Sequence, residues 1–344
     1  MDKHLRPTKI FNEFGERSID GRFIIGGNTT NIMELNNLKY GWAYDLYRIM
    51  GFANFWIPEE IPMNDDKKQY EKLLSEAEKR AYELVLSFLI ALDSFQVVNL
   101  KEFTRYLTAP ELHMAITAQE FQEALHSYSY QLILESVVDP IKADEIYNYW
   151  RQDEVLKERI KVIAEIYDSL RFNPSIENFV KAIIANYVLE GLYFYSGFAF
   201  FYTLGRQDKM LNTVQQIKYI NRDELTHVIL FRNIILNLKK EQPDVFKELE
   251  KWIVEYFKFA TYHEIRWGQY VTQNQILGIN NDLIEKYIKY LANLRITQLG
   301  FKPIYHITEN PLPWIDQFRT INNTKTDFFQ KKPQTYTKRN ELRW

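Results

Sequence analysis

The feature that most constrains this 344-residue chain is a pair of acidic residues, each set in the middle of an apolar helical segment. Asp93 lies in the sequence VLSFLIALDSF, and Glu190 lies in AIIANYVLEGLYFYSGFAFFYTL. An unpaired carboxylate is costly to bury, so a buried acid usually has a hydrogen-bond partner, a counter-charge or a metal ion. The chain must therefore fold so that some group meets these two carboxylates inside the core.

Apolar residues at three- and four-residue spacing run through most of the chain, which contains only 12 Gly and 11 Pro. This pattern predicts an all-α fold. Residues 75–78 and 108–111 each have the spacing of an N-terminal capping box. A short strand over residues 22–25 is the one exception that we expect. We predict helices over residues 36–49, 66–100, 109–138, 144–170, 175–204, 210–239, 243–272 and 280–298.

Residues 182–204 are long and apolar enough to cross a bilayer. A single span that carries a Glu at its middle, with no basic cluster to orient it, is nevertheless a poor membrane candidate. We favour a helix that is buried on all sides inside a large bundle.

Charge and cysteine content exclude several classes of protein. The 43 Lys and Arg residues nearly balance the 45 Asp and Glu residues, so nothing calls for nucleic acid or an anionic membrane as a partner. The chain has no cysteine, which excludes disulfides, thiolate metal sites and thiol catalysis within it. Its first residues lack the apolar stretch of a signal peptide, so we expect a cytoplasmic protein.

Two of the six histidines follow a glutamate by three residues, in the pairs Glu123–His126 and Glu224–His227. Residues three apart share one face of a helix, so each pair can direct a carboxylate and an imidazole at one point. Taken singly, either pair is more simply an exposed surface pair, and either lone acid is as readily a hydrogen-bonded buried acid.

The two pairs and the two lone acids together match the ligand set of a ferritin-like dinuclear carboxylate site, in which four helices each contribute inward. Each lone acid precedes its pair by a similar interval, which suggests a pseudo-twofold arrangement of two helix hairpins around two metals. Six ligands with four carboxylates suit iron or manganese better than zinc.

Tyr130 lies four residues after His126 on the same predicted helix face, where it could be oxidised if a metal pair activates dioxygen. Most of the 23 tyrosines must nevertheless be ordinary core or surface residues, and Tyr130 could be one of them. Asp223 lies beside Glu224 and could orient a ligand imidazole, although it could equally be a surface acid. Three apolar residues at helical spacing from the acids would form a dry wall near the site, which ordinary core packing explains equally well: Phe194, Phe198 and Ile220.

These residues and their surroundings resemble the small subunit of class I ribonucleotide reductase over nearly the whole chain. The His-Ser-x-Ser-Tyr run that begins at His126 is more discriminating than the spacing of the Glu-x-x-His pairs. The matching stretches are NFWIPEE (54–60), LDS (92–94), EALHSYSY (123–130), LEG (189–191), RDELTH (222–227), NPLPW (310–314) and TDFF (326–329).

The resemblance implies that two iron ions react with dioxygen and that Tyr130 becomes the stored tyrosyl radical, sheltered by the three apolar residues named above. A tyrosine at this position, and Asp93 rather than Glu, argue against manganese–iron forms. A dimanganese centre would use the same ligands and remains open. One metal would be held by Asp93, Glu123 and His126, and the other by Glu190, Glu224 and His227.

The resemblance also implies a division of labour. Trp56, Asp223 and His126 would form a hydrogen-bonded chain for electron transfer, and Tyr336 would relay oxidation to a large subunit. The missing cysteines fit this scheme, because the thiols that reduce the ribose must then belong to that partner. We expect a homodimer that works with a separate large subunit.

The composition changes near residue 322, where the chain becomes polar and basic. Such a composition is typical of a mobile tail. We therefore predict a ferritin-like helical domain with additional helices over residues 1–321 and a flexible tail over residues 322–344. The tail would bind the large subunit, with Leu342 and Trp344 as apolar anchors. Its basic character departs from the usual pattern of the family.

Two other functions share the six ligands. A ferritin-like oxidase or monooxygenase would act directly on a small substrate and would need neither Tyr130 nor a relay tyrosine in the tail. A non-catalytic iron-binding bundle would need no partner chain.

Overall fold

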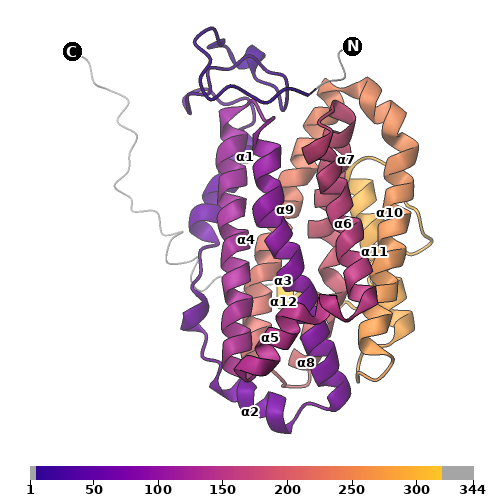
Figure 1. Ribbon diagram of the computed structural model, residues 1–344. Helices are drawn as coiled ribbons and strands as arrows, with labels where there is room; N and C mark the ends of the chain where they lie inside the picture. Colours follow the sequence, from indigo (N-terminus) through magenta and orange to yellow (C-terminus); the bar gives the residue numbers. More distant parts are fainter. Residues whose placement is uncertain (1–4, 320–344) are drawn as a thin grey trace.

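The computed structural model describes residues 5–319, which form a bundle of helices with most long axes along the height of Figure 1. The predicted domain boundary and Tyr336, Leu342 and Trp344 lie outside this range. The helices are α1 (Gly41–Arg48), α2 (Asn64–Lys72), α3 (Glu76–Thr104), α4 (Pro110–Val137), α5 (Pro140–Asn148), α6 (Glu154–Phe172), α7 (Ile176–Val188), α8 (Tyr195–Gly205), α9 (Leu211–Glu241), α10 (Pro243–Thr272), α11 (Asn281–Gln298) and α12 (Ile315–Arg319).

Several predicted helices are confirmed closely: α4, α9, α10 and α11 agree with the predicted ranges to within two residues at each end. The predicted helix over residues 36–49 is shorter in the structure, where α1 is followed by a π-helical turn over Ile49–Ala53. Short 3-10 turns lie at Ile19–Gly21, Pro58–Glu60 and Tyr149–Arg151.

Three predicted long helices, over residues 66–100, 144–170 and 175–204, are wrong as single elements. In the first two, a capping side chain starts a new helix inside the range. Residues 66–100 divide into α2 and α3, where the Ser75 hydroxyl accepts the Glu78 N–H at 3.2 Å and the Glu78 carboxylate accepts the Ser75 N–H at 2.8 Å. Residues 144–170 divide between α5, capped by Asp139, and α6, capped by Asp153.

The second predicted capping box and the predicted strand are also wrong. The hydroxyl of Thr108 donates to the Phe23 carbonyl at 2.6 Å and accepts the Gly27 N–H at 3.1 Å. It therefore stabilises the N-terminal loop and does not cap α4. Residues 22–25 form no strand; Ile25 makes one isolated antiparallel bridge to Leu107. The described part of the chain is therefore all-α, as predicted, with irregular loops before α1.

The apolar segment 182–204 is buried at every position, which confirms the interpretation as a core element. It is not one continuous α-helix, however, because a π-helical turn over Leu189–Tyr193 separates α7 from α8. In the described part of the chain, one helix, α3, has the length and composition of a membrane span, and 67% of its most apolar window is buried inside the protein.

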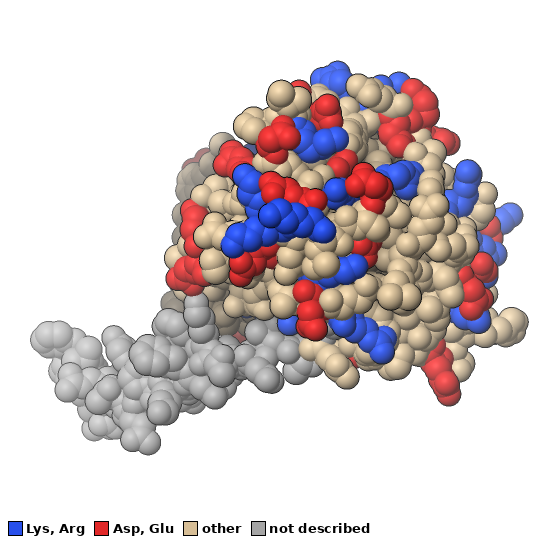
Figure 2. All heavy atoms as spheres, turned by 90° about the horizontal axis from the view of Figure 1, so that it is seen from below, with Lys and Arg blue, Asp and Glu red and all other residues tan. Residues whose placement is uncertain are grey.

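The long helices α3, α4 and α9, together with the segment from α7 to α8, surround the centre of the bundle. α3 packs along α4, and α7 and α8 both pack against α9. α10 and α11 pack on each other and form an outer layer on the right of Figure 1. Acidic and basic residues are intermixed on the face shown in Figure 2, as the nearly balanced composition predicts.

Candidate metal centre

The structure brings the six predicted ligands together at the centre of the bundle, where each is fully buried. They come from α3, α4, the π-helical turn and α9. They form two overlapping groups, and the ligand atoms within each group lie within 4.8 Å of one another. The groups are Asp93, Glu123, His126 and Glu224, and Glu123, Glu190, Glu224 and His227.

Glu123 and Glu224 belong to both groups because each directs one oxygen toward each histidine. The Nδ1 atom of His126 lies 3.1 Å from Glu224 Oε1 and 3.8 Å from Glu123 Oε2. The Nδ1 atom of His227 lies 2.9 Å from Glu224 Oε2 and 3.1 Å from Glu123 Oε1. The resemblance assigned each glutamate to one metal, whereas this geometry lets each glutamate reach both.

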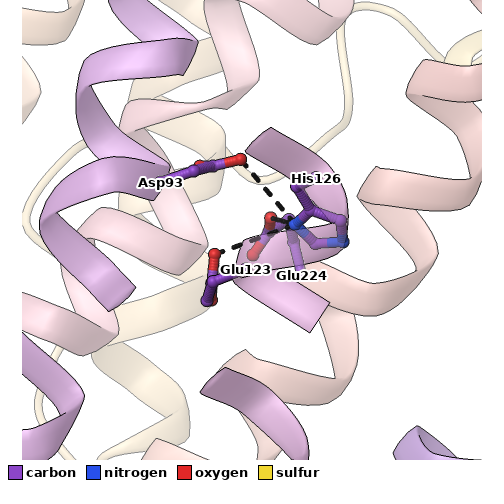
Figure 3. A group of neighbouring side chains, drawn as sticks. All are labelled: Asp93, Glu123, His126 and Glu224. Atoms are coloured by element: carbon purple, nitrogen blue, oxygen red, sulfur yellow. Dashed lines mark ion pairs between the residues drawn. The ribbon is translucent and has the colours of Figure 1, made fainter. Parts of the chain in front are cut away.

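Asp93 and Glu190 lie at opposite ends of the cluster. Asp93 Oδ2 is 3.8 Å from His126 Nδ1, and Glu190 Oε2 is 3.6 Å from His227 Nδ1. Figure 3 shows the first group, with the side chains of Asp93, Glu123 and Glu224 converging on the His126 ring. The cluster therefore has two histidine ends joined by two shared carboxylates.

The donor atoms of this cluster fit a pair of metal ions. Buried polar atoms normally have hydrogen-bond partners, so atoms without one require an explanation. Four carboxylates and two neutral imidazoles carry a charge that two divalent cations would balance, and such a donor set suits iron or manganese. The ligand atoms without a hydrogen-bond partner are both oxygens of Asp93, Glu123 Oε2, His126 Nδ1, Glu190 Oε2 and Glu224 Oε1.

The electrostatics of the cluster also indicate a need for positive charge. Burial, followed by repulsion from Glu123 and Glu224, raises the pKa values of the Asp93 and Glu190 carboxyl groups well above their usual range. Burial opposes protonation of His126, but its contact with Asp223 and the nearby carboxylates of Glu123 and Glu224 still raise its pKa. Protons and metal ions compete for such ligands, so bound cations would replace these protons.

The outward-facing nitrogen of each histidine is held by a second polar residue. His126 Nε2 lies 3.3 Å from Asp223 Oδ2, and the indole N–H of Trp56 donates to the same oxygen at 2.9 Å. Asp223 is fully buried, so its interpretation as a surface acid is wrong. His227 Nε2 lies 2.9 Å from Gln122 Oε1, a partner that our sequence reasoning missed.

Sequence reasoning also missed three amides that donate to one oxygen of Glu190. Gln119 and Asn186 donate to Glu190 Oε1 at 2.7 Å and 3.3 Å, and Gln96 donates to the same atom. Each amide lies three or four residues from a ligand in the same helical segment of the chain. The spacing of these amides inside apolar helical segments could have identified them as partners of the ligands.

Tyr130 is fully buried, and its hydroxyl has no hydrogen-bond partner. Burial and the negative charge of Asp93 raise the pKa of the phenol, although the two groups do not meet in hydrogen-bond geometry. The predicted apolar wall is buried as well, with the rings of Phe194 and Phe198 stacked at 5.7 Å and Ile220 fully inaccessible.

Comparison with known proteins decides the family. Residues 32–311 match the profile of the family "Ribonucleotide reductase, small chain". The chain is 45% identical to the ribonucleoside-diphosphate reductase subunit beta of Treponema pallidum, over 97% of this chain and 96% of that protein. The chain belongs to the ribonucleotide reductase small-chain family.

Solved structures agree with this family assignment. The ribonucleotide reductase R2 subunit from Clostridium botulinum is 51% identical, with a TM-score of 0.90 over 92% of this chain and all of that chain (100%). A putative class I ribonucleotide reductase from Bacillus halodurans is 39% identical, with a TM-score of 0.84 over 90% of this chain and 99% of that chain. The small chain is therefore an oxidoreductase subunit with the predicted ferritin-like fold, and its family implies a large-chain partner.

Proposed function

We propose that this small chain holds two iron ions in the six-residue cluster and stores a radical on Tyr130 for use by the large chain. The observation that carries the proposal is the set of buried ligand atoms without hydrogen-bond partners, next to a buried tyrosine whose hydroxyl is also unpartnered. When bound, the metal pair would use dioxygen as the oxidant to remove one electron from the tyrosine.

The protein controls how Tyr130 is oxidised. A phenol is protonated at neutral pH, and burial raises the pKa of Tyr130 further, so forming a neutral radical must remove a proton together with the electron. Full burial keeps water and external reductants away from the Tyr130 ring. A radical formed there would persist until an electron is returned along the chain of residues that leads to the surface.

Trp56, Asp223 and His126 are the residues that we assign to this route. Two hydrogen bonds to one Asp223 oxygen connect the Trp56 indole to the His126 ring, and thereby to the metal cluster. Trp56 is 5% exposed as a residue, so the chain of contacts reaches nearly to the surface. We assign the next step to Tyr336 in the tail, residues 322–344, which would dock on the large chain.

We also propose that the folded domain, residues 1–321, forms a homodimer in the cytoplasm. Apolar side chains are exposed over α3, α4 and the segment before α2, and the rings of Phe55 and Phe121 stack at 6.4 Å. The exposed residues are Phe52, Phe55, Val98, Phe121 and Tyr128. Exposed apolar patches often mark protein interfaces.

Sedimentation tests the homodimer. It should show a dimer that Phe121→Glu weakens, and a monomeric parent protein would contradict the proposal.

The decisive experiment compares Tyr130→Phe with Tyr167→Phe. Tyr167 is a suitable control because it is also buried and its hydroxyl also lacks a partner. After addition of ferrous iron and oxygen, the parent protein and Tyr167→Phe should show a tyrosyl radical by EPR and visible absorption. Tyr130→Phe should bind the same amount of iron but show no radical and support no nucleotide reduction with the large chain.

A Tyr130→Phe protein that keeps full nucleotide-reducing activity would refute the radical assignment. A parent protein that binds no metal pair would refute the metal assignment. Metal analysis of the protein from its native source distinguishes iron from manganese, since the same ligands would hold either ion.

A further inference from the structure

The π-helical turn Leu189–Tyr193 carries Glu190 and interrupts the helical segment that contributes this residue to the cluster. A π-helical turn widens the helix by one residue, so some backbone groups lose their regular i to i−4 partners. Buried backbone groups must then find partners elsewhere. The turn Leu189–Tyr193 therefore needs stabilising partners from other parts of the core.

Two buried side chains from the outer helices bind the backbone of this segment. Arg295 on α11 donates from Nε to the Gly191 carbonyl at 3.1 Å and from a terminal nitrogen to the Tyr195 hydroxyl at 3.0 Å. Glu264 on α10 accepts the Ser196 N–H at 3.0 Å. In a regular α-helix, the Gly191 carbonyl would accept the N–H of Tyr195 instead.

The contact between Arg295 and Gly191 requires the absence of a side chain. A Cβ atom at residue 191 would lie 2.8 Å from Arg295 Nε and 3.0 Å from its Cδ. Arg295 is only 4% exposed, and burying a guanidinium is costly unless its hydrogen bonds are made. The guanidinium is therefore packed directly on the backbone of the residue that follows Glu190.

The side chain of Glu190 is held from the opposite direction. Because Gln96, Gln119 and Asn186 donate to Oε1, only Oε2 lacks a hydrogen-bond partner, and this atom faces His227 Nδ1 at 3.6 Å. The position of Oε2 thus depends on two constraints, the amides on the side chain and Arg295 on the backbone. Asp93, at the other end of the cluster, lies within the continuous helix α3 and has no comparable turn.

We infer that Arg295 is a positioning residue that holds the π-helical turn so that Glu190 can bind the metal at the His227 end of the cluster. This inference rests on the proposed metal centre. Each residue of a helix rotates the side-chain direction by about 100°. A turn that relaxes toward a regular α-helix would therefore rotate Glu190 away from His227, while Asp93 and His126 stay in place.

Manganese alone is a suitable probe, because equilibrium dialysis gives its stoichiometry and EPR distinguishes a spin-coupled pair from an isolated ion. The parent protein should bind two ions per chain and show the coupled pair. Arg295→Met should bind one ion normally and the second about 10- to 100-fold more weakly, the loss typical for partners that orient a ligand. At intermediate manganese concentrations, Arg295→Met should show the six-line signal of an isolated ion.

Gly191→Ala tests the same contact without removing the guanidinium, because the added methyl group displaces it. It should cause the same selective loss, and the double variant Gly191→Ala/Arg295→Met should be no worse than the more impaired single variant. Arg295→Lys, which keeps one charged donor group, should recover part of the affinity for the second ion. Arg80→Met is the matched control, since Arg80 donates to the carbonyls of Tyr270 and Val271 at 3.1 Å, away from the cluster.

The outcomes separate the inference from the proposed function. If the parent protein binds fewer than two ions, the proposed metal centre fails. If the parent binds two ions but folded Arg295→Met and Gly191→Ala proteins bind both normally, or lose both equally, the positioning role of Arg295 is refuted. Normal binding of two ions by Arg80→Met, with the second ion weakened in both test variants, supports it.

Discussion

Asp93 and Glu190 hold corresponding places in the sequence, each a lone acid in an apolar segment before a Glu-x-x-His pair, but the structure builds their surroundings differently. Asp93 lies within the continuous helix α3, and both of its oxygens lack hydrogen-bond partners. Glu190 lies on a π-helical turn, and one of its oxygens accepts three amides. Only the other oxygen of Glu190 is left to bind a metal ion.

The difference shows how a pseudo-twofold ligand pattern can serve two unequal metal sites. At the Asp93 end, both carboxylate oxygens are available. At the Glu190 end, the carboxylate is fixed by neighbours before any metal arrives, which favours binding through one oxygen. Glu123 and Glu224 connect the two ends, because each directs one oxygen to His126 and the other to His227.

The largest effect should follow removal of a shared carboxylate. Glu123→Ala and Glu224→Ala should each abolish tight binding of both metals, because each residue contributes to both groups of ligands. Asp93→Ala and Glu190→Ala should each remove only one metal, and Glu135→Ala, an exposed acid on α4, should remove none. Metal content after dialysis measures this, and loss of a single metal in Glu123→Ala would contradict the shared role.

Metal binding should stabilise the fold by a smaller but measurable amount. Ligand that binds only the native state at 100 times its dissociation constant adds about 2.7 kcal/mol for each site. At a manganese concentration well above both dissociation constants, the free energy of unfolding of the parent protein should therefore rise by the contribution of two sites. Asp93→Ala should gain the contribution of one site, and scanning calorimetry with and without manganese measures the difference. The full parental gain in that variant would mean that Asp93 is not a ligand.

Loss of one amide should weaken one end of the cluster selectively. Gln119→Leu removes a donor at 2.7 Å from Glu190 Oε1, and it should lower metal affinity at that end by about 10- to 100-fold. Affinity at the Asp93 end should change much less, although Gln119 also contacts Glu123 at 3.2 Å. Gln131→Leu, an exposed amide on the same helix, is the control. Equal weakening at both ends would remove the proposed asymmetry.

The smallest effect on metal binding is expected for Trp56→Phe. The substitution removes the hydrogen bond to Asp223 but leaves all six ligands, so the protein should still bind two metals and form the Tyr130 radical. Nucleotide reduction with the large chain should be lost, because the route from the radical to the surface is broken. Trp42→Phe, on α1, should keep activity. Unchanged activity in Trp56→Phe would exclude this residue from the route.

Local sequence determined the parts of this site that depend on one helix. Helical periodicity alone places Glu123 with His126 on one face, and Glu224 with His227 on another. The Ser75–Glu78 capping box was also predictable, because its partners are three residues apart. The cost of burying a carboxylate marked Asp93 and Glu190 as residues that need a partner.

Tertiary structure decided what those residues meet. Arg295 contacts Gly191 across 104 positions of the sequence, and the amide of Gln96 reaches Glu190 across 94. The apolar pattern of residues 175–204 predicted one regular helix. That prediction failed because the widened turn depends on these distant partners and leaves no signal in the local sequence. The sharing of Glu123 and Glu224 between the two ends likewise depends on how α4 and α9 pack. Helical spacing fixes a side chain's direction on its own helix, whereas packing alone fixes the atoms that it faces.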